Sequence, residues 1–208
     1  MAINLQFSEE QDLIRRTARQ VFAAQFTPND VRKHQNSPEE YPAGLWRKMA
    51  ELGWLGMPFA EAHGGLEFGY LDMYPLYLEL GRSLATVPHL ETVVLAGGLI
   101  QALGTDAQKA ALLPAIAEGR TIVTPAFMEP DGSYDPEGIR LAAGKDHRLT
   151  GTKILVNFAG KADRLLVAAR SGGAGESGVS LFLVDPKGAG VALERTPNSA
   201  GLPLYAVT

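Results

Sequence analysis

The sequence contains no cysteine, which excludes disulfide bonds, thiolate metal sites and a cysteine nucleophile. It also lacks an excess of positive charge, because 19 Lys and Arg residues stand against 23 Asp and Glu residues and the formal net charge is -4. A nucleic-acid-binding protein is expected to carry a basic stripe, so this balance argues against one. No window approaches the roughly 20 apolar residues of a membrane-spanning helix, so we expect no membrane span.

The amino-terminal residues 1–7 lack the basic segment and apolar stretch that make up a secretory signal. We therefore expect a cytoplasmic protein. The chain has 208 residues, of which 46% are hydrophobic and 20% charged, as in a globular protein with one large domain or two small ones.

The first 120 residues carry the signals of helices. Capping boxes at Ser8–Gln11 and Thr105–Gln108 predict two helix starts, because each hydroxyl can accept from the amide three residues later. Apolar residues at helical spacing predict three further helices, at about residues 42–53, 71–81 and 91–103. In the second of these segments, Leu71, Tyr74 and Leu78 form one apolar face.

After Gly119 the pattern changes to short apolar runs bounded by Gly, Pro, Asp or Asn, which predict strands. These runs are residues 121–127, 139–143, 153–156, 165–169, 179–184 and 191–195, with a hairpin turn expected at residues 144–147. Helices followed by strands, rather than the two in alternation, predict an α+β multidomain chain. We expect an all-α helical domain at residues 1–120 and an antiparallel β-barrel or β-sandwich domain at residues 121–208.

Several patterns look like functional motifs but favour structural interpretations. Gly173–Gly178 matches G-x-G-x-x-G, yet residues 179–184 predict a strand where a dinucleotide site needs a helix, so we expect a hairpin loop. The four histidines show no ligand spacing, so we expect surface or loop histidines and no metal site. No serine has the G-x-S-x-G context of a nucleophile elbow.

The segment Glu129–Ser133 leaves two interpretations open. It can form a wide turn between strands, in which Asp131 and Asp135 hydrogen-bond their own backbone. Alternatively, the backbone amides of Gly132 and Ser133, with the Ser133 hydroxyl, can bind a phosphate or diphosphate without a buried charge.

Five groups of segments, taken in order, resemble the acyl-CoA dehydrogenase family over essentially the whole chain. They are Phe7–Gln11; Leu52–Pro58 with Gly64–Gly65 and Leu80–Arg82; Gly104–Lys109 with Leu113-Pro114; Ala126–Ser133; and Leu149–Asp163. The last two occupy the places of the family's flavin-facing segments.

The resemblance implies a helical domain, a β domain and then a C-terminal helical bundle, with FAD held between the β domain and the helical bundles. In the family, a carboxylate removes the α-proton of an acyl thioester while the β-hydrogen leaves as hydride to flavin N5. The thioester carbonyl is polarised by a flavin hydroxyl and a backbone amide. Implied partners are an acyl-CoA substrate, an electron-transfer flavoprotein or similar acceptor, and further acyl-CoA dehydrogenase-like subunits in a homo- or hetero-oligomer.

The same resemblance assigns the site residues. Those expected to face the flavin ring are Phe127, Met128, Leu155, Val156 and Asn157, and Ser133 is expected near the flavin diphosphate or the CoA. The family's Thr-Glu-Pro is Met128-Glu129-Pro130 here, and its Trp-Ile-Thr-Asn reads Leu155 to Phe158. Leu155 therefore replaces an aromatic wall, the Asn157 amide replaces a hydroxyl, and Tyr134-Asp135 takes the place of a Ser-Asp pair.

The resemblance leaves the catalytic residue outside this chain, because most family members carry the catalytic Glu in the third domain. The sequence ends within an expected strand, which favours a β domain that is incomplete at its C-terminal end. We therefore expect this chain alone to be inactive. The expected function is FAD-dependent dehydrogenation of an acyl-CoA to the 2,3-enoyl-CoA. The alternatives are a non-catalytic subunit of a heteromeric enzyme, favoured by Met128 and Leu155, and a flavin oxidase or monooxygenase of the same fold.

Overall fold

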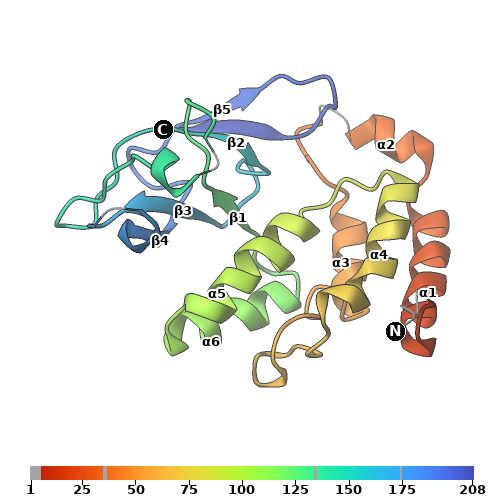
Figure 1. The fold of residues 1–208 in the computed structure, drawn as a ribbon. Coiled ribbons are helices and arrows are strands. Elements are labelled where there is room, and N and C mark those ends of the chain that lie inside the picture. The colour runs from red at the N-terminus through yellow and green to blue at the C-terminus, as the bar shows by residue number, and fades with distance from the viewer. Residues whose placement is uncertain (1–5, 35–36, 134, 174) are drawn as a thin grey trace.

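The computed structural model describes residues 6–34, 37–133, 135–173 and 175–208. Two expectations fall wholly or partly outside these ranges: the missing secretory signal at residues 1–7 and the replacement at Tyr134. The chain passes from helices to strands, and the change falls between Ala117 and Val123 (Figure 1). The domain boundary near residue 120 stays a prediction. In the described ranges, no helix is long and apolar enough to cross a membrane.

The helical half is all-α, as the sequence predicts. Its elements are α1 Glu9–Gln25, α2 Pro28–His34, α3 Ala43–Glu51, the short η1 Glu61–His63, α4 Tyr70–Ser83, the π-helix η2 Leu90–Gly97, α5 Gly98–Leu103 and α6 Asp106–Ala117. Both capping boxes are confirmed. The Ser8 hydroxyl accepts from the Gln11 amide at 3.2 Å, and the Thr105 hydroxyl accepts from the Gln108 amide at 3.3 Å. Helix α2 was not predicted, since its seven residues bury none of their side chains.

Helix α4 turns a different face to the core from the one its leucine spacing favours. Leu71, Tyr74 and Leu78 do share a face, but all three are exposed. The buried apolar residues are Met73, Pro75, Leu76 and Leu80, on the side that packs against α1. The sequence carries two apolar stripes on this helix, and only the packing partner decides between them.

The fourth predicted helix, residues 91–103, consists of two different helices. Its first part, η2, is a π-helix, and α5 continues it as an α-helix. A π-helix winds more loosely than an α-helix and often marks a functional region. Apolar periodicity does not distinguish the two over so short a segment, so the sequence did not reveal the π-helix.

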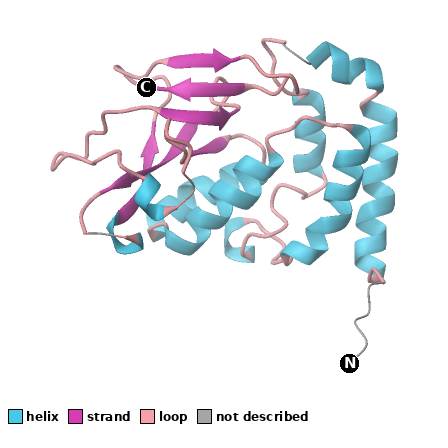
Figure 2. Cartoon of the chain, turned by 45° about the horizontal axis from the view of Figure 1, so that its top comes forward, coloured by secondary structure: helices cyan, strands magenta, loops and turns pink. Residues whose placement is uncertain are grey.

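The strand half consists of two three-stranded sheets (Figure 2). The strands are β1 Val123–Ala126, β2 Lys153–Asn157, β3 Arg164–Arg170, β4 Val179–Val184, β5 Leu193–Thr196 and β6 Leu204–Val207. One sheet has the order β1-β3-β4 and the other β2-β6-β5. The expected sheet domain is present, but β1 and β3 pair in parallel, so the expectation of purely antiparallel pairing is wrong for this pair. The G-x-G-x-x-G segment lies in the connection of the antiparallel pair β3–β4, as predicted for a hairpin.

The expected strand at residues 139–143 does not form. Only Ala142 and Ala143 make isolated bridges, to Arg170 and Leu149. The backbone amides of residues 140 and 141 donate instead to the Glu129 carboxylate, which removes them from any ladder. The hairpin turn at residues 144–147 is confirmed, since the Gly144 amide donates to the Arg148 carbonyl.

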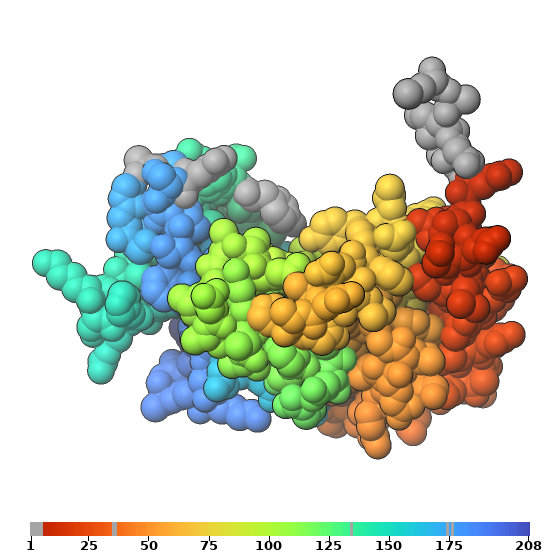
Figure 3. All heavy atoms as spheres, turned by 90° about the horizontal axis from the view of Figure 1, so that it is seen from below, coloured from red at the N-terminus to blue at the C-terminus, as the bar shows by residue number. Residues whose placement is uncertain are grey.

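One hydrophobic core runs through both halves. Helix η2 packs against β1, and Val93 and Ala96 belong to the same buried cluster as Val123 and Ala126. In the space-filling view, α5 and α6 (yellow-green) lie between the blue strand half and the red and orange first helices (Figure 3). The site residues predicted after β1 and on β2 therefore lie at the junction of the two halves.

Candidate functional site

The two segments expected to face a flavin lie side by side. The Ile154 amide donates to the Met128 carbonyl at 2.9 Å, and the Lys153 ammonium donates to the Phe127 carbonyl at 3.1 Å. These bonds hold the residues that follow β1 against the start of β2. The structure thus brings residues 127–128 next to β2, and the expectation that residues 155–157 share one site with them stays a prediction.

A cavity of about 330 Å³ opens beside these residues. It is lined by Leu99, Phe127, Met128, Ser133, Asp135, Ile139, Ala168, Val179 and Leu181. We call it the 127–133 groove. Its walls come from α5, β3, β4 and the loop after β1, and most of them are apolar. Ser133 and Asp135 are the polar residues among its described lining, which contains no Lys or Arg. Such a groove suits a flat or extended apolar group with a polar end.

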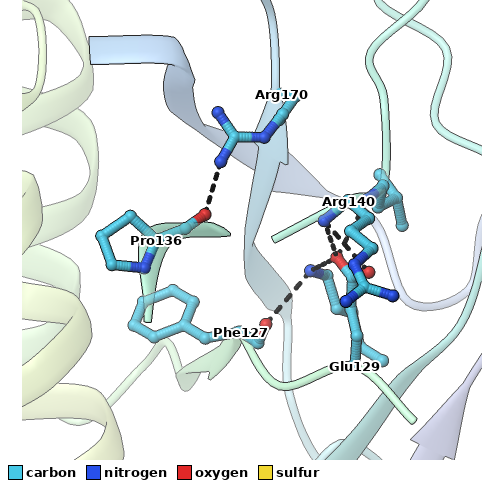
Figure 4. Close-up of polar contacts among 7 residues, drawn as sticks. Phe127, Glu129, Pro136, Arg140 and Arg170 are labelled. Carbon is cyan, nitrogen blue, oxygen red and sulfur yellow. Dashed lines mark hydrogen bonds and ion pairs between the residues drawn. The ribbon is translucent and has the colours of Figure 1, made fainter. Parts of the chain in front are cut away.

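The Glu129 carboxylate fixes the loop that forms this groove (Figure 4). It accepts from the Arg140 and Leu141 amides at 3.1 and 3.0 Å and from the Lys153 ammonium at 2.7 Å. Burial raises the pKa of Glu129, but these hydrogen bonds outweigh that effect and hold the pKa below its usual value. A carboxylate with this many donors is a structural anion and a poor proton acceptor.

The segment Glu129–Ser133 is therefore a turn. The Gly132 amide donates to the Glu129 carbonyl at 2.9 Å, and Gly132 has a φ of +72° that favours glycine. Since this amide is engaged within the turn, the Gly132 part of the phosphate-binding hypothesis is wrong. The Ser133 hydroxyl accepts from the Asp135 amide at 3.3 Å and lies on the groove.

Arg170 fixes two loops near the groove through its side chain. Its guanidinium donates to the Pro136 carbonyl (Figure 4) and, at 3.0 Å, to the Gly175 carbonyl. It thereby ties the end of β3 to two loops.

Strand β2 presents its three predicted site residues in three different directions. Leu155 is 47% exposed and has a φ of +54°, next to a register shift between Lys153 and Val156. Strained backbone of this kind is concentrated at functional sites. The Val156 side chain is buried in the core, and the expectation that this residue faces the flavin ring stays a prediction. Successive side chains of a strand point to opposite faces, so the Val156 side chain points inward where that of its neighbour Leu155 points outward.

Asn157 points toward the helical half. Its Nδ2 donates to Oε1 of Glu91 at 2.9 Å, and its backbone carbonyl accepts from the Thr124 hydroxyl at 2.6 Å. Its Oδ1 is buried and has no partner among the described residues. Burial raises the pKa of the Glu91 carboxyl above its usual value, and its hydrogen bonds to its own backbone amide and Asn157 only partly offset that rise.

Sequence reasoning missed Glu91, Lys153 and Leu99 as residues of this region. A signal existed for Glu91, since it is a lone carboxylate in an apolar helical run. Lys153 begins an apolar strand in the same way. Leu99 could not be distinguished by its sequence context from the other apolar residues of its helix.

The histidines take no part in this region. The expectation of surface or loop positions is wrong for His89, which is buried between the Tyr77 hydroxyl at 2.7 Å and the Trp54 carbonyl at 3.1 Å. Burial lowers the pKa of His89 to about 4, so the ring is neutral and structural. Among the residues with a described position, no three His, Cys, Asp or Glu are grouped to hold a metal ion.

Comparisons with known proteins agree with these observations. The profile of the acyl-CoA dehydrogenase N-terminal domain matches residues 8–120, and that of the acyl-CoA dehydrogenase middle domain matches residues 125–207. Acyl-CoA dehydrogenase FadE27 of Mycobacterium tuberculosis is 36% identical over 169 residues, which are 80% of this chain and 43% of that protein.

Two solved structures share the fold. The ChsE4-ChsE5 complex from Mycobacterium tuberculosis superposes with a TM-score of 0.85 and 28% identity, over 99% of this chain and 55% of that one. A variant of the steroid ACAD Tcur3481-Tcur3483 superposes with a TM-score of 0.84 and 34% identity, over 96% of this chain and 54% of that one. The chain spans about half the length of these relatives.

Proposed function

The chain belongs to the acyl-CoA dehydrogenase family, and from this we propose that it forms the helical and β parts of a FAD-dependent enzyme that oxidises an acyl-CoA to the 2,3-enoyl-CoA. The observation that carries the proposal is the 127–133 groove. It places Phe127, Met128 and Ser133 on one cavity beside β2. We further propose a cytoplasmic enzyme that works in a homo- or hetero-oligomer and passes electrons to an electron-transfer flavoprotein or a similar acceptor.

The residues present fit the ring of a flavin better than its diphosphate. The groove offers apolar walls, and β2, outside its lining, adds the exposed Leu155 side chain and the unpartnered acceptor Asn157 Oδ1. For the diphosphate, the described lining has only the Ser133 hydroxyl and no cation. We therefore assign the ring to this chain and expect charged residues outside the groove to contribute to the diphosphate site.

A bound flavin supplies the acceptor for the β-hydride. The residues of this chain bind, orient and exclude water. Phe127, Met128 and Leu181 form apolar walls, and a ring bound against them would exclude water and so strengthen each polar contact within. Glu129 is not proposed as the base, because its hydrogen bonds stabilise the charged form. The base is assigned to the part of the enzyme that this chain does not span.

The test is turnover by the complete flavin-loaded enzyme, including the part that carries the base, because this chain alone is expected to be inactive. With an acyl-CoA and an electron acceptor, we expect enoyl-CoA to form in proportion to flavin content. Oxygen consumption without an added acceptor would indicate an oxidase instead. A flavin-loaded protein that converts no acyl-CoA, alone or with a partner, would contradict the proposed activity.

A second candidate is a subunit that does not itself catalyse the reaction but completes a heteromeric acyl-CoA dehydrogenase. Met128 and Leu155 favour it, because they stand where the family pattern has a hydroxyl and an aromatic wall. The similarity to the ChsE4-ChsE5 complex adds support. Co-expression with a homologue encoded nearby separates the two candidates: flavin and activity that appear only in the mixture support the second.

A further inference from the structure

A hydrogen bond between a buried carboxylate and a half-buried carboxamide crosses the junction of the two halves. Asn157 on β2 donates from Nδ2 to Oε1 of Glu91, the second residue of η2, at 2.9 Å. Glu91 is 8% exposed, and η2 packs against β1. The Thr124 hydroxyl of β1 holds the backbone carbonyl of Asn157. Backbone and side chain of Asn157 are therefore fixed from two different elements.

The carboxamide of Asn157 is satisfied at one end only. Its NH2 group has Glu91, while its oxygen is buried with no partner among the described residues. Buried polar atoms nearly always have a hydrogen-bond partner, so an unsatisfied one is a position where a ligand or a water can bind. Glu91 determines which group of the carboxamide lacks a partner, the NH2 group or the oxygen. An acceptor placed at the NH2 end leaves the oxygen as the free group.

We infer that Glu91 is a positioning residue that fixes the Asn157 carboxamide with its oxygen, rather than its NH2 group, available to a hydrogen-bond donor of the bound flavin. This inference rests on the proposed function, because it takes Asn157 to lie at the flavin ring. The donor set of the ring depends on its redox state. Reduced flavin carries N–H groups at both N3 and N5, whereas oxidised flavin carries only the one at N3 and has an acceptor at N5.

A fixed acceptor placed at N5 therefore favours the reduced flavin over the oxidised one, whereas an acceptor at N3 would serve both. If the carboxamide were free to rotate, its NH2 group could serve the oxidised ring equally well, and the preference would disappear. Oxidised and reduced flavin contact the same carboxamide, so fixing its orientation changes the ratio of their two dissociation constants. A single hydrogen bond changes such a ratio by about three- to tenfold.

The test is a double-mutant cycle on the holoprotein. Glu91→Met removes the acceptor with little change of volume, and Asn157→Leu removes the carboxamide. For each variant, the dissociation constant of oxidised FAD and the midpoint potential of the bound flavin give the ratio of oxidised to reduced binding. We expect Glu91→Met to weaken reduced flavin about three- to tenfold relative to oxidised flavin, which lowers the midpoint potential. Glu91→Met should have no further effect in the Asn157→Leu background.

Two more variants separate positioning from structure. Glu91→Gln keeps a carbonyl acceptor and should retain a ratio within about twofold of wild type. Glu79→Gln alters another buried carboxylate, one bonded to Arg19 on the far helices, and should change the melting temperature but not the ratio.

Each other outcome overturns the inference. Equal effects of Glu91→Met with and without Asn157 would show that the two residues act independently. A fall in melting temperature with an unchanged ratio would make Glu91 purely structural. If the wild-type protein binds no flavin, alone or with a partner, the proposed function itself is contradicted. That result is seen before any variant is made.

Discussion

Two buried glutamates at the edge of the β half, Glu129 and Glu91, differ in how completely their surroundings are satisfied. Glu129 receives two backbone amides and the Lys153 ammonium. Glu91 receives its own backbone amide and the side-chain amide of Asn157, whose oxygen has no described partner. The first network is complete within the chain, so it serves the fold. The second network leaves the Asn157 oxygen without a hydrogen-bond partner among the described residues, so it is the one suited to a ligand.

This difference shows that membership in a sequence motif does not indicate which of the two glutamates is suited to a ligand. Glu129 belongs to the segment that most clearly resembles a flavin-facing motif, yet its contacts are those of a loop anchor. Glu91 belongs to no motif. Within such a segment, the groups whose hydrogen bonds are satisfied internally build the shape, and their neighbours on the groove are the residues proposed to bind the ligand.

The largest loss of stability is expected when the Lys153 ammonium is removed from the Glu129 network. Lys153→Met leaves Glu129 as a buried charge without its cation, which should lower the free energy of unfolding by about 3–5 kcal/mol. Denaturant unfolding measures the loss. The exposed Lys161→Met is the matched control and should stay within about 0.5 kcal/mol of wild type. A loss below about 1 kcal/mol for Lys153→Met would show that the network does not hold the loop.

A double variant sharpens the same point. Adding Glu129→Gln to Lys153→Met removes the stranded charge, so part of the lost stability should return. If Glu129→Gln lowers the free energy of unfolding in the Lys153→Met background as much as it does alone, the two side chains contribute independently and the account of a stranded charge is wrong.

The next largest effect is expected from filling the groove. Val179→Trp places an indole in the 127–133 groove and should weaken flavin or acyl-CoA binding at least about tenfold. Fluorescence or absorbance titration of the holoprotein measures the affinity. Ser180→Trp puts the same bulk on the opposite face of β4 and should leave affinity within about twofold. Equal effects of both variants would place the ligand elsewhere.

Breaking the open pair should cost binding more than stability. Asn157→Ala should raise the flavin dissociation constant about three- to tenfold, because the ring loses its acceptor. Asn198→Ala is the control, since the Asn198 amide is bonded at both ends within its own loop. It should alter stability only. Unchanged flavin content and spectrum in Asn157→Ala would show that Asn157 does not contact the ring.

The smallest effect is a contrast in pH dependence. The lowered pKa of Glu129 means that its contribution to stability is present above the usual Glu pKa of about 4.3 and is lost as pH falls through the folded-state value. The raised pKa of Glu91 has the opposite sign. Its contribution is present below about 4.3 and is lost as pH rises through the folded-state value.

Unfolding free energies at a series of pH values measure this contrast. Glu129→Gln should flatten the loss of stability on the acid side, and Glu91→Gln should flatten the loss on the side toward neutral pH. The same slope change in both variants would contradict the difference between the two networks.

Much of the fold follows from local signals in the sequence. The capping boxes at Ser8 and Thr105 are satisfied within four residues, so no distant contact is needed to predict them. The exposed stripe of Leu71, Tyr74 and Leu78 could not be recognised, because a helix with two apolar faces is oriented by its partner α1. The missing strand at residues 139–143 depends on Glu129, ten residues away, and local alternation carries no sign of it.

The site was predictable only in part for the same reason. Family segments placed Phe127, Met128 and Ser133 together, and the groove contains all three. The burial of the Val156 side chain could not be predicted, because a single-residue register shift decides which side chains of β2 point outward. Glu91 needed the packing of η2 against β1, which no spacing in the sequence encodes.

The absorbance spectrum of the purified wild-type holoprotein tests the central claim most directly. The claim is that the junction around Asn157 and the 127–133 groove receives a flavin. It predicts a flavin band between about 350 and 500 nm that an acyl-CoA bleaches. A protein without this band, whether purified alone or with an acyl-CoA dehydrogenase-like partner, would contradict it.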